Sequence, residues 1–134
     1  MLMEALPLAR HGFHFTSSAG GLYEGQLNVG PESIPFPRRP YGQLKLEQER
    51  HLSALAMPVS KFIYRPSSVY GFVSDKKRLG LIPTLINNAI RRQVTSIFAD
   101  AVTLRDYVFV DDVADYMADR IQFNSPGRNE VFVL

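Results

Sequence analysis

The sequence has 134 residues, of which 46% are hydrophobic and 21% charged, a composition that suits one globular domain and excludes wholesale disorder. The formal net charge of +2 is too small to indicate nucleic-acid binding, and the lack of cysteine excludes disulfides, zinc thiolates and thiol nucleophiles. No apolar run approaches the roughly 20 residues that span a bilayer, and Glu4 and Pro7 interrupt the short apolar N-terminus, so we expect a cytoplasmic protein without membrane anchor or signal peptide.

The first half of the chain predicts a strand, a long loop, a helix and a second strand. Residues 12–18 alternate aromatic and polar side chains, as a short strand does, and residues 19–25 predict a glycine-rich turn. Four prolines between residues 31 and 40 exclude a regular element there, and the last of them suits the first position of a helix over 41–56. Residues 61–65 predict the second strand, which completes a βαβ unit with parallel strands.

The second half predicts two longer helices and several short strands. We expect helices over 79–92 and 111–123, and strands at 95–98, 106–110 and 129–134. The helix over 111–123 begins with two aspartates, whose charge complements the helix dipole. Its apolar face should comprise Val113, Tyr116, Met117 and Ile121.

The helix over 41–56 should pack through an apolar stripe and end at Pro58. The stripe comprises Leu44, Leu52, Leu55 and Ala56. The polar and charged side chains are expected elsewhere on the helix: Gln43, Glu47, Glu49 and Arg50.

Tyr41 and Lys45 lie one turn apart on a single face of this helix. A lysine ammonium beside a phenol favours the phenolate, and such a pair can exchange a proton with a substrate hydroxyl. Tyr116 and Arg120 have the same spacing, but there we expect only two side chains on a solvated helix face. Spacing alone therefore does not separate a catalytic pair from a surface pair.

Four stretches that occur in order along the chain carry a resemblance to one family. They are HFTSSAGGLYEG (14–25), RPYGQLKLEQE (39–49), YRPSSVYG (64–71) and TLRDYVFVDDVADYM (103–117). Together they resemble the extended short-chain dehydrogenase/reductases, specifically the NAD-dependent epimerase/dehydratase family that acts on nucleotide sugars. The resemblance implies an α/β fold, with a partial Rossmann-type parallel sheet around a late βαβ unit and part of a small C-terminal substrate domain.

The resemblance implies catalytic roles for three residues. Tyr41 matches the active-site tyrosine, the general acid/base for a sugar hydroxyl, and Lys45 matches the lysine that binds the nicotinamide ribose; both would touch the cofactor. Ser18 matches a serine or threonine that hydrogen-bonds the reacting oxygen. Ser17 is an alternative, because one residue more than in the commonest family pattern precedes Tyr23.

The resemblance also implies binding residues. Arg65 and Pro66 match the strand end near the nicotinamide and would contact the cofactor. Ser68 stands where the family often has an asparagine that contacts substrate phosphate. Arg105 matches the arginine that holds the nucleotide diphosphate, a task that suits the bidentate geometry of a guanidinium. No metal site is expected, because the histidines lack further ligands at metal spacing.

The sequence lacks the glycine-rich turn with which this fold class holds a dinucleotide pyrophosphate, and it has no P-loop. We therefore expect the chain to be the back part of an epimerase/dehydratase. Residues 1–65 would end its NAD-binding domain and residues 66–134 would begin its substrate-binding region, with weak or no NAD binding by this chain alone.

Two hypotheses about function follow. In the first, the full enzyme oxidises a sugar carbon with NAD; a 4-epimerase acting on a UDP-hexose is the nearest choice, and a dehydratase is the other. In the second, the chain is catalytically inert and serves as a binding or dimerisation module. The expected partners are a nucleotide sugar and a second copy of the chain, as a homodimer or through an exposed sheet edge. Neither nucleic acid nor a membrane is expected.

Overall fold

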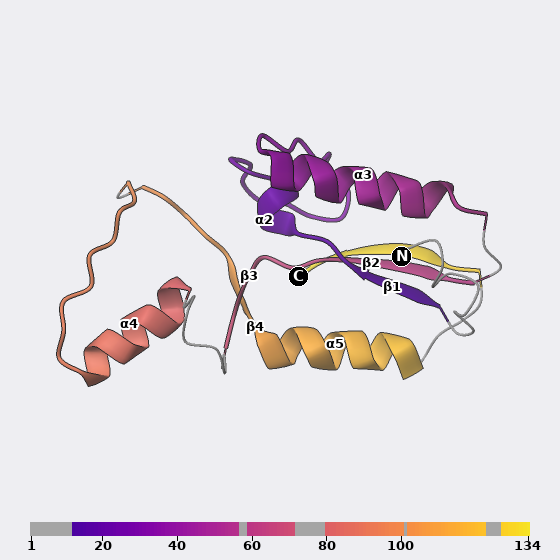
Figure 1. The fold of residues 1–134 in the computed structure, drawn as a ribbon. Helices are drawn as coiled ribbons and strands as arrows, with labels where there is room; N and C mark the ends of the chain where they lie inside the picture. The colour runs from indigo at the N-terminus through magenta and orange to yellow at the C-terminus, as the bar shows by residue number, and fades with distance from the viewer. Residues whose placement is uncertain (1–11, 57–58, 72–79, 101, 123–126) are drawn as a thin grey trace.

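The main sheet contains three parallel strands in the order β1–β2–β5 (Figure 1). The computed structural model describes residues 12–56, 59–71, 80–100, 102–122 and 127–134. The strands are β1 (Phe13–Thr16), β2 (Lys61–Arg65) and β5 (Asn129–Val133). Lys61 pairs with Phe13 on one side and with Asn129 on the other, so β2 is central, and all five of its residues are buried. The parallel pairing of β1 with β2 confirms the predicted βαβ unit.

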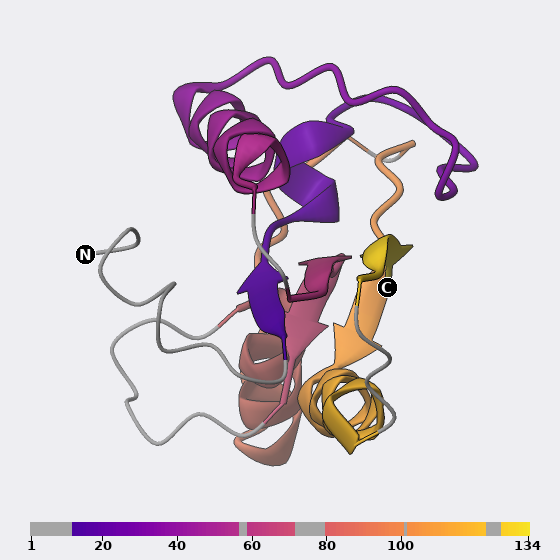
Figure 2. The same cartoon turned by 90° about the vertical axis from the view of Figure 1, so that its right-hand side faces the viewer.

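Helices cover both faces of this sheet (Figures 1 and 2). The short α2 (Ala19–Leu22) and the long α3 (Pro40–Ala54) lie on one face, and α5 (Val110–Gln122) lies on the other. Successive side chains of β2 alternate between the two faces, as the pleat of a strand requires. In the described part of the chain, no helix is long and apolar enough to cross a membrane.

Aromatic rings fill the space between the sheet and α5. His14 of β1 stacks on Phe62 with ring centroids 4.8 Å apart, and Tyr64 stacks on Phe132 of β5 at 5.4 Å. Tyr116 of α5 meets Phe132 edge-on at 5.4 Å. The expectation that Tyr116 and Arg120 would lie on a solvated helix face is therefore wrong for Tyr116, because its ring packs against the sheet and Arg120 lies over that ring.

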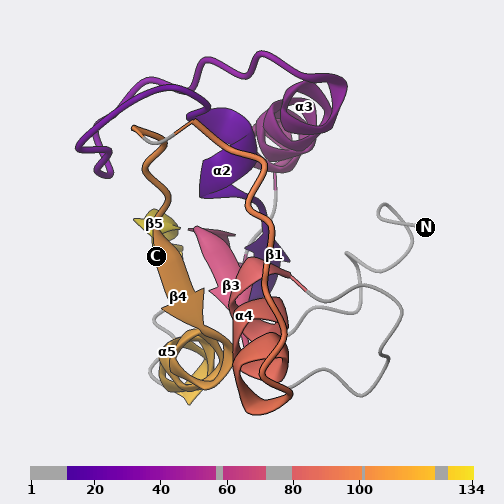
Figure 3. The ribbon, with the colours of Figure 1, turned by 90° about the vertical axis from the view of Figure 1, so that its left-hand side faces the viewer.

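A second, two-stranded sheet extends away from the first. It consists of β3 (Ser68–Tyr70) and β4 (Tyr107–Phe109), which are parallel, and α4 (Leu81–Ile90) lies beyond it. Figures 1 and 3 show the long connection that rises from α4 and returns to β4, from which the chain enters α5 directly. The helix predicted over 79–92 is confirmed with shorter bounds, and the helix predicted over 111–123 is confirmed as α5, which begins one residue earlier, at Val110.

The strand predicted at 95–98 is wrong, and β3 was not predicted. Residues 95–98 form no helix or strand, and the strand that pairs with β4 is β3. Phe98 is 98% exposed, so this apolar stretch packs little of its surface.

The glycine-rich turn predicted at 19–25 is wrong at its start, where α2 forms. Ser18 caps that helix, since its hydroxyl oxygen accepts a hydrogen bond from the Gly21 N–H at 3.1 Å. In α3, Pro40 lies in the first turn as expected, but Leu44 is 53% exposed whereas Glu49 is only 4% exposed. The predicted apolar stripe is therefore confirmed at Leu52 and wrong at Leu44, and a charged residue takes part of the buried face. Pro58 lies outside the described residues.

The division at residue 65 stays a prediction. Strand β5 belongs to the second predicted region, yet it pairs with β2 over Lys61–Arg65 and completes the sheet of the first.

Candidate functional site

The site forms at the carboxyl edge of β1 and β2. Parallel α/β sheets bind their ligands at this edge, where loops leave the strand ends. The Ser17 N–H donates to the Tyr64 carbonyl at 2.6 Å, and the Ala19 N–H donates to the Pro66 carbonyl at 2.8 Å. These two bonds hold the Ser17–Ser18 segment directly beside the end of β2.

Ser18 and Ser17 have different surroundings. Ser18 is partly exposed, and its oxygen accepts the N-capping hydrogen bond of α2. A serine hydroxyl has one donor as well as its acceptor lone pairs, so the O–H of Ser18 can still donate to a ligand. Ser17 is 4% exposed, and its Oγ has no hydrogen-bond partner in the described structure.

Tyr41 lies in the first turn of α3 and faces α2. A β-carbon at Gly21 would lie 3.1 Å from both Cδ1 and Cε1 of the Tyr41 ring, so this ring packs against the helix that Ser18 begins. The tyrosine is nevertheless 56% exposed, which leaves its phenol accessible to a ligand.

Lys45 lies one turn further along α3 and reaches the end of β1. Its Nζ donates a hydrogen bond to the Thr16 carbonyl at 3.0 Å and lies 5.0 Å from the centre of the Phe15 ring. The ammonium has three N–H donors. Thr16 immediately precedes Ser17 and Ser18, so the structure brings Ser18, Tyr41 and Lys45 to one strand end.

Arg65 is bound inside the protein rather than directed towards solvent. Its Nε and Nη2 donate to the two carboxylate oxygens of Glu49 at 3.0 and 2.6 Å, and its Nη1 donates to the hydroxyl of Tyr23. Burial alone would lower the pKa of Arg65, but its hydrogen bonds to Glu49 and the charge of that carboxylate outweigh burial and raise the pKa. The cofactor contact expected of Arg65 and Pro66 stays a prediction, with both residues buried.

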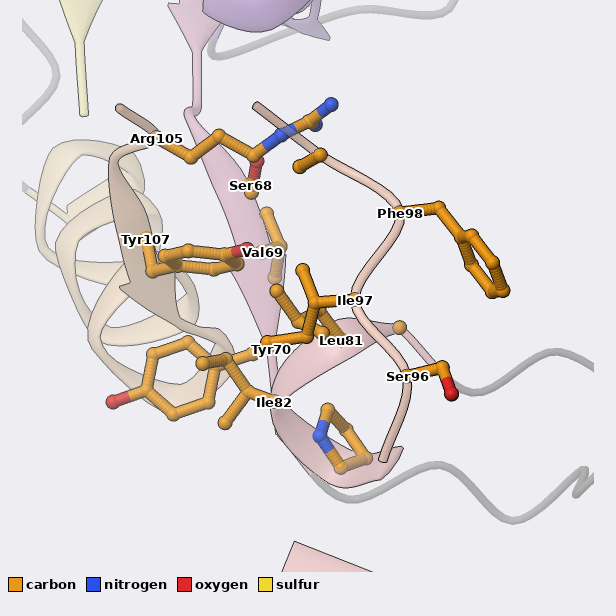
Figure 4. Close-up of a pocket in the computed structure, with 13 residues that line it drawn as sticks. Ser68, Val69, Tyr70, Leu81, Ile82, Ser96, Ile97, Phe98, Arg105 and Tyr107 are labelled. Carbon is orange, nitrogen blue, oxygen red and sulfur yellow. The ribbon is translucent and has the colours of Figure 1, made fainter. Parts of the chain in front are cut away.

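Ser68 and Arg105 meet in a pocket of about 370 Å³ at the second sheet. Figure 4 shows both residues towards one end of the pocket in this view, with the ring of Tyr107 below them. The Ser68 N–H donates to the Asp106 carbonyl at 3.1 Å, which fixes β3 beside the segment that carries Arg105. The remaining lining is mostly apolar and comes from β3, α4 and the connection after it: Val69, Tyr70, Leu81, Ile82, Pro83 and Ile97 among others.

Sequence reasoning missed the residues that hold these groups in place. Glu49 and Tyr23 bind Arg65, and Gly21 and Gly42 allow α2 and α3 to approach closely. One signal was present: Glu49 follows Lys45 by four residues and Tyr41 by eight, which places all three near one face of α3. Among the described residues, no cluster of side chains could hold a metal ion.

Residues 1–134 match the profile of the NAD dependent epimerase/dehydratase family. A Methanocaldococcus jannaschii protein named "Putative UDP-glucose 4-epimerase" is 36% identical over 106 residues, which are 75% of this chain and 34% of that protein. The UDP-glucose 4-epimerase of Thermotoga maritima, solved with UDP-glucose, has a TM-score of 0.76 at 27% identity over 99% of this chain and 44% of its own. MoeE5, solved with UDP-glucose and NAD, has a TM-score of 0.81 at 25% identity over 99% of this chain and 45% of its own. The chain thus spans less than half the length of each of these proteins.

Proposed function

Because the chain belongs to the NAD-dependent epimerase/dehydratase family, we propose that it supplies the proton-transfer and substrate-binding residues of an NAD-dependent UDP-hexose 4-epimerase. One observation carries the proposal. Ser18, Tyr41 and Lys45 meet at the carboxyl end of β1, and the pocket of Ser68 and Arg105 begins just beyond the carboxyl end of β2. A sugar nucleotide that places its diphosphate in the pocket can extend its sugar towards the phenol of Tyr41.

Each residue of the first group has a chemical task that its contacts permit. The exposed side chain of Tyr41, as a phenolate, takes the proton of the sugar hydroxyl that is oxidised, and as the resulting phenol it returns that proton later, as a general acid/base does. Ser18 donates its O–H to the same sugar oxygen while its own oxygen stays on the Gly21 N–H. Lys45, fixed on the Thr16 carbonyl, provides a positive charge near that oxygen.

The donors at this edge fit the nicotinamide end of NAD. Lys45 uses one N–H on Thr16, which leaves two that can bind the ribose hydroxyls. When bound, NAD supplies the oxidant that accepts the electrons of the sugar carbon. Arg65 uses three of its five N–H donors on Glu49 and Tyr23, which leaves one N–H on each Nη for the cofactor contact proposed for this strand end.

The pocket supports an anionic nucleotide as substrate. Arg105 is exposed at the mouth of the pocket, where its guanidinium can bind phosphate oxygens in pairs. The rings of Tyr70 and Tyr107, whose centroids are 6.4 Å apart, offer flat apolar surface for a base.

Substrate binding is tested on this chain with UDP-glucose by isothermal titration. Arg105→Ala should weaken binding about tenfold or more, since a hydrogen bond to a charged group contributes about 1.5–3 kcal/mol. Arg128→Ala is the matched control, because Arg128 is exposed and its guanidinium contacts Glu130 at 3.4 Å. Equal affinity of the two variants would refute the proposed diphosphate site.

Proton transfer is tested in a chimera that joins this chain to the part of the Thermotoga maritima enzyme that it does not cover. Tyr41→Phe should lower turnover about a hundredfold or more, with little change in substrate affinity, because only a hydroxyl is removed. Tyr116→Phe, at the same spacing from a basic residue, should have almost no effect. If the two variants behave alike in an active chimera, the acid/base role of Tyr41 fails, and the alternative of an inert binding module gains support.

We also propose self-association through the free edge of β1. Strand β1 pairs with β2 on one side, and no strand of the described structure pairs with its other side. An unpaired edge offers N–H and C=O groups that a second chain can bind. Light scattering should show a dimer or larger species, and a monomer at all concentrations would contradict it.

A further inference from the structure

Two glycines, one in each helix, let α2 and α3 approach closely. A β-carbon at Gly42 would collide with the carbonyl oxygen of Gly21 and would lie 2.8 Å from Cβ of Pro37. A β-carbon at Gly21 would lie 3.1 Å from two carbons of the Tyr41 ring, closer than carbon atoms normally pack. The neighbouring Gly20 is different, since a β-carbon there would meet nothing within 4 Å.

We propose that Gly21 is a positioning residue for Tyr41, because its missing side chain sets the place of the Tyr41 ring relative to the Ser18 hydroxyl. Both groups depend on the four residues of α2. Ser18 begins this helix as its N-cap, and the Tyr41 ring lies on the helix at Gly21. The inference rests on the proposed function, in which the two groups share one sugar oxygen.

Backbone hydrogen bonds and buried side chains hold α2 in place against an added methyl group. The Ala19 N–H donates to the Pro66 carbonyl at 2.8 Å, and the Phe36 N–H donates to the Leu22 carbonyl at 2.9 Å. Leu22 is fully buried and Tyr23 is 4% exposed. The Tyr41 ring, by contrast, is more than half exposed and can turn outwards. Gly21→Ala should therefore displace the ring and leave the fold in place.

The first test uses this chain and ring signals of labelled tyrosine in NMR spectra. Tyr41→Phe identifies the Tyr41 signal by its disappearance. Gly21→Ala should shift that signal and leave the other tyrosines unchanged, whereas Gly20→Ala, in the same helix, should shift none. If Tyr41 gives the same signal in both alanine variants, the inference is wrong.

The second test guards against a variant that folds poorly. Gly21→Ala should lower the thermal midpoint more than Gly20→Ala does. In a Tyr41→Ala background the ring is absent, and the next neighbour of the added methyl group, Cα of Gly42, would lie at 3.4 Å, an ordinary contact, so the two alanine substitutions should then have similar effects. A difference that persists in that background would overturn the inference, because the added methyl group would be colliding with something else.

The third test uses the active chimera. Gly21→Ala should lower kcat about tenfold or more and change KM less than twofold, as misplacement of a reacting group does. An equal effect of Gly20→Ala on kcat would count against the inference. The results also separate the two proposals: if Tyr41→Phe leaves turnover unchanged while Gly21→Ala shifts the Tyr41 signal, the proposed function fails and the positioning contact stands.

Discussion

Arg65→Met should destabilise the protein strongly, because it leaves the carboxylate of Glu49 buried without its partner. Arg65 binds both oxygens of Glu49, at 3.0 and 2.6 Å, and the two side chains are 9% and 5% exposed. Removal of one member of a buried ion pair costs about 3–5 kcal/mol. Domains are stable by only about 5–15 kcal/mol, so the thermal midpoint should fall by about 10–20 °C.

The matched control is Arg39→Met, which makes the same substitution at the surface. Arg39 contacts Glu24 at a similar distance, 3.0 Å, but its side chain is 79% exposed. A solvated pair of this kind contributes less than about 1 kcal/mol. The double variant Arg65→Met with Glu49→Leu removes both buried charges and should regain most of the lost stability.

Urea unfolding at pH 7, followed by circular dichroism, gives the free energy of unfolding of the starting protein, the two single variants and the double variant. Thermal unfolding gives their midpoints. The expected order of stability is Arg39→Met, close to the starting protein, then the double variant, then Arg65→Met. If Arg65→Met and Arg39→Met lose equal stability, or if the double variant is no better than Arg65→Met alone, the role of burial in this reasoning is refuted.

Three further predictions concern the sheet, the end of α3 and the cofactor. Burial raises the pKa of Tyr64 to about 12, from about 10 in the unfolded chain. The stability that this difference contributes should be full below about pH 10 and be lost between about pH 10 and 12. Unfolding curves at a series of pH values measure that loss, and Tyr64→Phe should reduce it. Lys61→Met should cost about 1–3 kcal/mol and speed amide exchange at the end of α3, because the buried Nζ donates to the carbonyls of Ser53 and Leu55 at 3.0 and 2.5 Å. Isothermal titration of this chain with NAD should show no micromolar affinity, since its sequence has no glycine-rich pyrophosphate turn, and low-micromolar binding would contradict this.

Local patterns in the sequence predicted the elements whose stability is local. Alternation in β1, the β-branched and aromatic run of β2 and the proline before α3 each report a backbone preference that needs no distant partner. Residues 95–98 show the limit of such reasoning. They have the composition of a strand, but a strand also needs a neighbour to pair with, and β4 pairs with β3 instead.

The candidate site was predicted where motifs carry chemistry and missed where partners are distant in sequence. Ser18, Tyr41 and Lys45 were identified from the resemblance, and the structure brings them to one strand end. Glu49 was placed off the apolar stripe, because nothing near it in the sequence shows that Arg65 would neutralise it inside the protein. The short helix α2 was missed because its two glycines suggest a turn. The hydrogen bond from the Gly21 N–H to the Ser18 hydroxyl, which caps this helix, is visible only in the structure.

Ser18 has two tasks in this structure, and substitutions can separate them. As the N-cap of α2 it accepts the Gly21 N–H, and in the proposed function its O–H also binds the sugar oxygen. Ser18→Ala should lose both, with about 1 kcal/mol of stability, whereas Ser18→Gly loses the hydroxyl at a cost of only a few tenths. Ser18→Thr keeps the hydroxyl and should keep both tasks.

Turnover in the chimera should therefore follow the hydroxyl and not stability. Ser18→Gly should be nearly as stable as the starting protein and as slow as Ser18→Ala, and Ser18→Thr should be stable and active. Ser17→Ala is the control for the alternative serine; its buried oxygen has no described hydrogen-bond partner, so its loss should affect neither property much. If Ser17→Ala has low turnover while Ser18→Gly keeps normal turnover, the two serines have been assigned the wrong way round. The sugar oxygen would then lie beside the buried Ser17, deeper in the sheet edge than the exposed Tyr41 can reach.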